Sequence, residues 1–212
     1  EAASVWPDRI RERGDRLSHA TWHYVNLPYA VGVEPPRPTS QENVVWAIEH
    51  NRRILFDPGR SDRERAVALS WVLHLVGDVH QPLHACSRYA PDYPQGDRGG
   101  NDFLIRTGST SIRLHSYWDA AAAMLLDRPP PGRLRGMAGE LRASHPRASL
   151  PALADRRPSE WAAESRRLAE TAAYEGVEFD RTVTQEYAAR ARKVARERLV
   201  IAGYRLADLL NR

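Results

Sequence analysis

The sequence predicts an all-α protein, a single-domain multi-helix bundle over residues 1–212 with a small β-hairpin. Residues 66–79 are apolar on nearly every face, a pattern typical of a helix buried inside a domain. Near the carboxyl end, apolar residues alternate at spacings of four and three, which indicates a core-facing helical stripe. That stripe comprises Ala195, Leu199, Ala202, Leu206 and Leu209. Strand candidates are confined to residues 103–105 and 111–113, on either side of Gly108.

The expected helices span residues 4–16, 41–56, 61–79, 115–126, 158–175 and 184–210. Thr39 and Ser40 are candidates for capping the second of these, because their side chains accept hydrogen bonds from the free N–H groups of a first turn. The proline-rich residues 34–38 and 129–132 are expected to be connectors. No linker divides the chain convincingly, so one domain is expected.

The overall composition favours a polyanionic partner. The 212 residues include 31 basic and 27 acidic side chains, which gives a formal net charge of +4. Lys193 is the only lysine, so arginine supplies almost all of the positive charge. The single cysteine, Cys86, excludes an internal disulfide. No stretch approaches the roughly 20 apolar residues needed to cross a bilayer, so we expect no membrane insertion.

The buried segment 66–79 carries a polar pair. His74 and Asp78 lie four residues apart, so they share one face of the expected helix. An ionised carboxylate without a partner would be costly in such a poorly solvated place. Either a buried hydrogen bond between the two side chains or a bound metal ion would compensate it, and this pair alone leaves both interpretations open.

Further histidines and aspartates favour the metal. The same His-x-x-x-Asp spacing recurs at residues 115–119, in a second expected helix. His84 follows Pro82, where the chain must turn and can aim a side chain back toward the same cavity. Imidazole and carboxylate ligands without thiolate suit zinc in an open, catalytic site. The candidate ligands are Asp8, His23, His74, Asp78, His84, His115 and Asp119.

The order of these motifs resembles the S-one/P-one family of zinc-dependent, single-strand-specific nucleases, which are distant relatives of bacterial zinc phospholipase C. The matching segments are Trp6-Pro7-Asp8, His23-Tyr24, His74 to Asp78, Gln81-Pro82-Leu83-His84, Gly99-Gly100-Asn101 and Leu114-His115-Ser116-Tyr117-Trp118-Asp119. Similarity continues through residues 161–169 and 202–211. The resemblance implies a phospholipase C/P-one nuclease-like fold. Because fungal and plant relatives carry several cysteines, it also indicates a bacterial, secreted or periplasmic protein.

The resemblance assigns the ligands to ions. It implies a first ion held by Asp8, His23, His74 and Asp78, and a second held by His84, His115 and Asp119. A third family ion shares Asp78 and takes its other ligands from an amino-terminal tryptophan and a histidine five residues later. No histidine precedes His19 here, so we expect a truncated form that lacks its amino-terminal segment. A separate amino-terminal fragment, or a two-ion protein, are the alternatives. The expected cofactor is Zn²⁺, three ions in the family and at least two from the ligands present.

The activity implied by the resemblance is cleavage of single-stranded DNA or RNA to 5′-phosphorylated products, together with 3′-nucleotidase activity. In the family a hydroxide that bridges metal ions attacks the phosphate, which gives Asp78 its expected catalytic role. Arg11 matches a family arginine that steadies the phosphate charge. Because residues 9–13 form a basic run, the alternative is that Arg11 is a solvated surface residue.

Substrate recognition is expected from Tyr24, Asn26 and Asn101. Family members stack the base on an aromatic residue at the position of Tyr24, and stacking tolerates any sequence; alternatively, Tyr24 belongs to the core. Asn26 replaces a family aspartate with a group that both donates and accepts, so base preference is expected to differ. The glycines before Asn101 permit close approach of backbone to the metals, or form the turn that opens the hairpin.

Two other functions stay open from the sequence. A zinc phospholipase C would use the same ligands on a lipid phosphodiester, although Tyr24 and Asn26 fit the nuclease pattern. A non-catalytic metal-binding module is the other, because the third-ion ligands are missing. No separate protein partner is implied, apart from a possible amino-terminal fragment. The remaining histidines are expected to have minor roles: His80 a supporting or surface position, and His19, His50 and His145 solvated positions.

Overall fold

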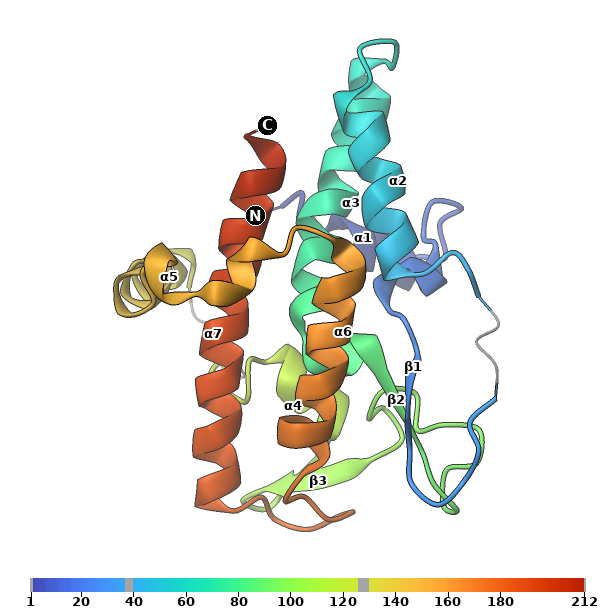
Figure 1. Ribbon diagram of the computed structural model, residues 1–212, viewed down its shortest axis with the longest axis vertical. Coiled ribbons are helices and arrows are strands. Elements are labelled where there is room, and N and C mark those ends of the chain that lie inside the picture. The colour runs from blue at the N-terminus through green and yellow to red at the C-terminus, as the bar shows by residue number, and fades with distance from the viewer. Residues whose placement is uncertain (1, 37–39, 126–129, 212) are drawn as a thin grey trace.

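A computed structural model describes residues 2–36, 40–125 and 130–211 and shows a mainly helical protein (Figure 1). Its longest helices, α3 (Asp62–His80) and α7 (Gln185–Leu210), run along the molecule with α6 (Pro158–Leu168) packed against α3. Helix α2 (Val44–Phe56) forms a hairpin with α3. The all-α fold class predicted from the sequence is therefore confirmed.

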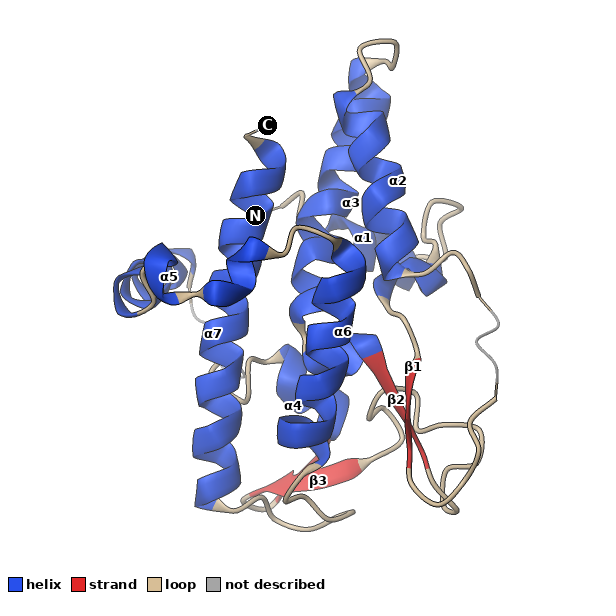
Figure 2. Ribbon diagram, in the orientation of Figure 1, coloured by secondary structure: helices blue, strands red, loops and turns tan. Residues whose placement is uncertain are grey.

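Two small sheets accompany the helices (Figure 2). Strands β3 (Leu104–Thr107) and β4 (Thr110–Arg113) form the predicted antiparallel hairpin, and Gly108 in its turn has a φ of 60°. The other sheet was not predicted: β1 (Leu27–Ala30) pairs in parallel with β2 (Cys86–Tyr89). This pairing joins segments far apart in sequence, which local patterns do not reveal.

Helix α3 begins and ends almost where the sequence predicted. The Ser61 side chain accepts a hydrogen bond from the Glu64 backbone N–H, and the Glu64 carboxylate accepts one from the Ser61 N–H, so the two form a capping box. Helix α2 starts later than expected because Asn43 is its cap, with Oδ1 accepting hydrogen bonds from Val45 and Trp46. Of the expected caps, residue 39 lies outside the described residues, as do residues 37–38 of the first connector.

Several helix boundaries differ from the prediction. Helix α1 covers only Trp6–Glu12, since Pro7 suits a first helical turn and residues 2–5 form turns instead. Helix α4 (Leu114–Asp119) ends early because residues 121–123 adopt positive φ angles; residue 126, its expected end, is outside the described residues. The predicted helix 158–175 is divided into α6 and a π-helix, η5 (Ala169–Tyr174).

Helix α5 (Pro131–Ser144) was not among the predicted helices, and its first two residues fall in the predicted connector 129–132, of which residue 129 is not described. The proline suggested a break, yet proline at the first helical position is compatible with a helix. The predicted stripe on α7 also needs a correction. Ala195 and Leu209 are buried, whereas Leu199 is 45% exposed. Four tryptophans are buried in the core: Trp22, Trp71, Trp118 and Trp161.

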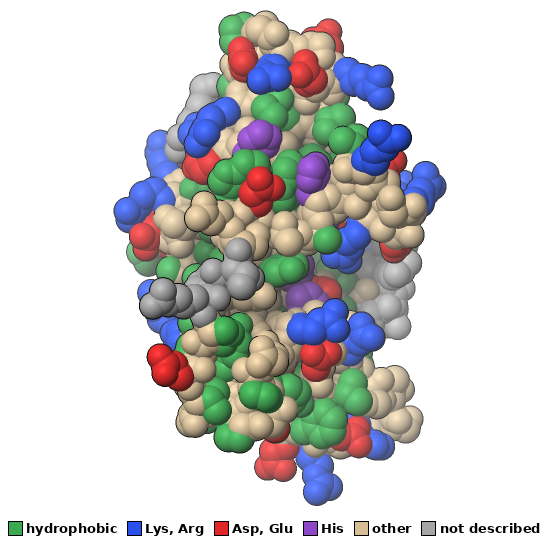
Figure 3. Space-filling view, turned by 90° about the vertical axis from the view of Figure 1, so that its right-hand side faces the viewer, with side chains coloured by type: hydrophobic (Ala, Val, Ile, Leu, Met, Phe, Trp, Pro, Cys, Tyr) green, Lys and Arg blue, Asp and Glu red, His purple; other side chains and the backbone are tan. Residues whose placement is uncertain are grey.

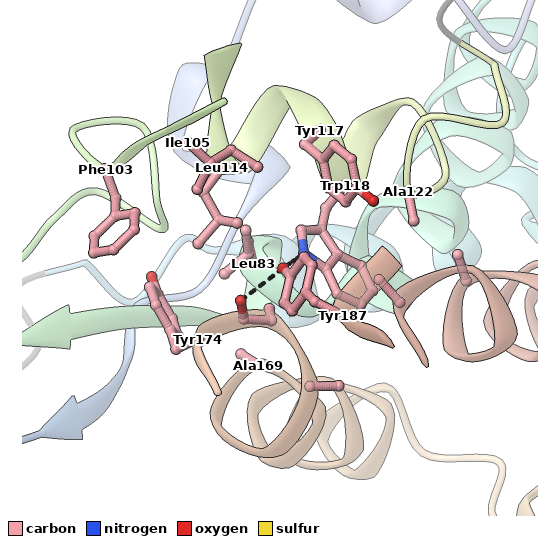
Figure 4. Close-up of a cluster of buried hydrophobic side chains, with 14 of the residues drawn as sticks. Leu83, Phe103, Ile105, Leu114, Tyr117, Trp118, Ala122, Ala169, Tyr174 and Tyr187 are labelled. Atoms are coloured by element: carbon pink, nitrogen blue, oxygen red, sulfur yellow. Dashed lines mark hydrogen bonds between the residues drawn. The ribbon is translucent and has the colours of Figure 1, made fainter. Parts of the chain in front are cut away.

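The core beneath α4 holds this short helix in place (Figure 4). Tyr117 and Trp118 are buried among side chains from the hairpin, η5 and α7. The Trp118 indole N–H donates to the Tyr187 hydroxyl at 3.0 Å, and that hydroxyl donates to the Ala173 carbonyl at 2.8 Å. These contacts fix α4 on η5 and α7, so the neighbouring His115 and Asp119 have a defined position.

None of the described helices is long and apolar enough to cross a membrane.

Candidate metal centre and substrate cleft

A cleft of about 700 Å³ collects the residues that the sequence singled out. Ten of the predicted site residues line it: Asp8, Arg11, His23, Tyr24, Asn26, Asp78, His84, Asn101, His115 and Asp119. His74 contacts three of these residues, Asp8, His23 and Asp78, and its side chain is 10% exposed. Figure 3 shows histidine and acidic side chains in a hollow of the surface, bordered by Lys or Arg side chains. Segments far apart in the chain therefore meet at one cleft.

Asp8, His23 and His74 converge as the first group of candidate ligands, from α1, the short helix η1 (Ala20–His23) and α3. Asp78, also from α3, lies against the two imidazoles of this group. His23 Nδ1 and His74 Nε2 lie 2.9 Å apart, and each is within 3.1 Å of Asp78 Oδ2. Asp8 Oδ1 is 3.9 Å and 3.7 Å from the same nitrogens. Ligands about 2.0 Å from a tetrahedral zinc ion lie about 3.3 Å apart. The observed separations fit such an ion.

The second group is His84, His115 and Asp119, from the turn after α3 and from α4. His84 Nε2 lies 3.3 Å from Asp119 Oδ1, and His115 Nε2 lies 3.5 Å from Asp119 Oδ2. The two imidazole rings are 4.7 Å apart between centroids. Two nitrogens and a carboxylate converging in this way leave ligand positions open, as in catalytic zinc sites.

Backbone carbonyls orient three of the four histidines. The Nδ1–H groups of His74, His84 and His115 donate to the carbonyls of Ser4, His23 and Gly99, at 2.8, 2.6 and 2.7 Å. A carbonyl can only accept, so each Nδ1 carries a proton, and Nε2 is the nitrogen that faces the cluster.

His23 faces the first group with Nδ1 instead, and its Nε2 is buried without a hydrogen-bond partner among the described residues. With Nδ1 as a ligand, the proton of a neutral imidazole must sit on this buried Nε2. Each of the four histidines therefore turns one ring nitrogen toward the cluster, and in its neutral form that nitrogen can bind a metal ion.

The aspartates and histidines of the cleft shift one another's pKa values. Burial raises the pKa of Asp78, but His84, His23 and His74 outweigh this effect and bring it well below its usual range. Burial lowers the pKa of His84, yet Asp78 and Asp119 raise it to about 9. The pKa of His115 is lowered by burial and by repulsion from His84. Ionised aspartates therefore attract cations, whether protons or metal ions.

Two residues that position metal ligands, Gln81 and Gly99, were not recognised in that role from the sequence, although both belong to the motifs that match the family. Gln81 Nε2 donates to Asp119 Oδ1 at 2.8 Å, while its side-chain oxygen accepts from the Leu83 N–H. A Cβ on Gly99 would lie 2.5 Å from the Leu83 carbonyl oxygen, and Gly99 has a φ of 64°. Glycine at this position is therefore needed for the close approach that brings its carbonyl to His115.

The predicted substrate residues border the same cleft. Tyr24 is 38% exposed, so the alternative that it belongs to the core is wrong. Asn26 lines the cleft beside it. Asn101 Nδ2 donates to the Arg98 carbonyl at 2.9 Å. The Arg11 side chain is 49% exposed, and its Nη2 lies 3.7 Å from Asp8 Oδ1. Arg11 is thus a surface residue, and it also lines the cleft.

The other histidines lie outside both groups. His80 is 2% exposed, so its expected surface position is wrong. Its Nδ1–H donates to the Val76 carbonyl and its Nε2 accepts from Arg205, while burial lowers its pKa well below the usual value. His19 and His50 were expected to be solvated, but they are half-buried and stack on Trp22 and Trp46. His145, also expected to be solvated, is likewise half-buried.

Comparison with known proteins identifies the family. The model of the family described as S1/P1 Nuclease matches residues 1–212. Endonuclease 1 and Endonuclease 2 of Arabidopsis thaliana are each 28% identical to the chain; the matches cover 100% and 98% of it, and 74% and 76% of the two relatives. Nuclease S1 of Aspergillus oryzae is 26% identical over 55% of the chain and 39% of its own length. The chain therefore belongs to the S1/P1 nuclease family, whose members hydrolyse phosphodiester bonds in nucleic acids, as the order of its motifs predicted.

Proposed function

We propose that the protein is a zinc-dependent endonuclease that cleaves single-stranded DNA or RNA to 5′-phosphorylated products and also removes the phosphate of 3′-nucleotides. One observation carries the proposal: two groups of imidazole and carboxylate ligands adjoin one cleft that also contains an exposed aromatic ring and arginines. We propose that a single domain, residues 1–212, carries this activity. From the family resemblance, we also propose a secreted or periplasmic location.

Two zinc ions fit the nitrogen and oxygen donors at the cleft. The first would be held by Asp8, His23, His74 and Asp78, and the second by His84, His115 and Asp119. Zinc bound there supplies Lewis acidity toward a phosphate oxygen and lowers the pKa of water toward neutrality. For the family's third ion, the described residues offer Asp78 but no histidine upstream of His19. We therefore propose at least two ions per chain.

The protein side chains position the substrate around the ions. Arg11 would hold a non-bridging oxygen of the scissile phosphate, because its guanidinium lies beside Asp8 and reaches the cleft. Tyr24 would stack on the base, and Asn26 would hydrogen-bond to its edge. Asn101, in the loop between β2 and β3, would contact the substrate while its side chain donates to the Arg98 carbonyl. Asp78 would stay ionised throughout, since its pKa is well below the usual range.

The experiment pairs metal analysis with two substrates. The chain is loaded with zinc, its bound zinc is counted, and release of acid-soluble nucleotides from denatured DNA is compared with hydrolysis of phosphatidylcholine. We expect at least two zinc ions and nucleotide release alone. Lipid hydrolysis without nucleotide release would favour a phospholipase C. Full zinc occupancy with no turnover on either substrate would favour a non-catalytic module, and adding a separate amino-terminal segment would then show whether it completes the site.

A further inference from the structure

Two arginines at the cleft, Arg98 and Arg113, have no role in the proposed metal sites or in the proposed base site. Both line the cleft. The Arg98 side chain is 76% exposed, and its ion pair with Asp102 is long, at 3.5 Å. Arg113 is exposed and has no ion-pair partner among the described residues. Both guanidinium groups are therefore available to an anion in the cleft.

The loop that carries Arg98 is held rigidly. Arg98 itself has a φ of 56°, a conformation that is uncommon for a residue with a side chain. The preceding Asp97 is fully buried; its carboxylate accepts hydrogen bonds from the Arg88 N–H at 2.9 Å and from the Tyr174 hydroxyl at 2.7 Å. Asn101 binds the Arg98 carbonyl on the other side. The unfavourable backbone conformation of Arg98 is held by the hydrogen bonds of Asp97 on one side and of Asn101 on the other. Such strain, maintained by the surrounding structure, indicates that the position of Arg98 has a function.

Arg98 and Arg113 flank the same ligand. The residue after Arg98, Gly99, accepts the Nδ1–H of His115, and Gly100 accepts its backbone N–H at 3.1 Å. Arg113 lies at the start of α4, two residues before His115, where the Leu114 N–H is bound to the Phe103 carbonyl. The two arginines are thus placed beside the second metal group, whereas Arg11 lies beside Asp8 in the first.

We propose that Arg98 and Arg113 form a subsite for the phosphate of a nucleotide next to the scissile bond. The inference rests on the proposed function and goes beyond it, because it assigns a preference for polynucleotides over single nucleotides. Guanidinium groups present forked donors that match phosphate oxygens. Contacts to phosphate carry no base information, so this subsite would act on any sequence. A 3′-mononucleotide has one phosphate, at the metals, and would not use it.

The test compares the double variant Arg98→Ala/Arg113→Ala with a matched control, Arg133→Ala/Arg167→Ala, which removes two exposed arginines outside the cleft. The substrates are a short oligothymidylate and thymidine 3′-monophosphate. For the double variant we expect KM on the oligonucleotide to rise about tenfold with kcat nearly unchanged. The salt dependence of log(kcat/KM) should become shallower by about 0.7, the value for one lost phosphate contact on a single strand. Hydrolysis of the mononucleotide should stay within about twofold of wild type.

Other outcomes separate this inference from the proposed function. An unchanged KM and salt slope on the oligonucleotide would overturn the subsite, as would an equal loss on both substrates, which would instead indicate damage to the support of His115. Arg98→Lys/Arg113→Lys should restore most of the salt slope because it restores the charge; failure to do so would also count against the subsite. If the wild-type protein hydrolysed neither substrate, the proposed function itself would fail.

Discussion

Replacing Gln81 by methionine should weaken zinc binding at the second metal group with little loss of stability. Methionine has a similar length but cannot donate to Asp119 or accept from the Leu83 N–H. Removing a partner that orients a metal ligand typically lowers metal affinity by about 10- to 100-fold, or about 1.4 to 2.7 kcal/mol. Asp119 is 47% exposed, so water replaces part of the lost hydrogen bond, and the lower end of this range is expected.

The assay is a competition titration with a zinc-binding dye, combined with nuclease activity at limiting and at excess zinc. Gln81→Met should lose activity at limiting zinc and recover most of it in excess. Thermal unfolding of the metal-free protein should change by about 2 to 4 °C, the effect of about 1 kcal/mol in a chain of this size. Gln95→Met, at an exposed position, is the control. Equal zinc affinity in Gln81→Met and wild type would refute the role given to this hydrogen bond.

Three further predictions concern ligands and stability. Asp78→Asn should remain folded, bind less zinc and lose nuclease activity; unchanged turnover would contradict the role of Asp78. Tyr187→Phe should destabilise the fold by about 2 to 4 kcal/mol in urea unfolding, because it leaves the buried Trp118 N–H and a carbonyl unsatisfied; a loss below about 0.5 kcal/mol would count against the anchoring of α4. Burial raises the pKa of Glu164, but its bonds to Arg205 and Arg198 lower it overall. Its stabilising contribution is therefore present above the unfolded pKa, about 4.3, and lost as the pH falls below it; Glu164→Gln should show a shallower loss of stability in this range, and an equal pH dependence would disprove the assignment.

Local geometry explains which features could be predicted from the sequence. The pairs His74 with Asp78 and His115 with Asp119 lie one helical turn apart, so their proximity follows once a helix is expected. The hairpin around Gly108 follows in the same way from short-range pairing. Helix α5 was missed because a proline at a helix start and a proline in a connector look alike in sequence.

Contacts between distant segments were invisible for a physical reason. The parallel pairing of β1 with β2 depends on where each segment lands after folding, and so does the burial of His80 against Arg205. The hydrogen bond from Gln81 to Asp119 crosses between α4 and the turn after α3, and no spacing in the sequence encodes it.

By itself, the sequence determined the helical fold class, the family and the residue types that could bind metal, because these depend on composition, periodicity and motif order. Only the tertiary structure decided that these residues border one cleft, which nitrogen of each histidine faces it, and that Arg98 and Arg113 lie at its edge. Packing sets the relative positions of separate elements, and these positions decide which way a histidine nitrogen or an arginine guanidinium points.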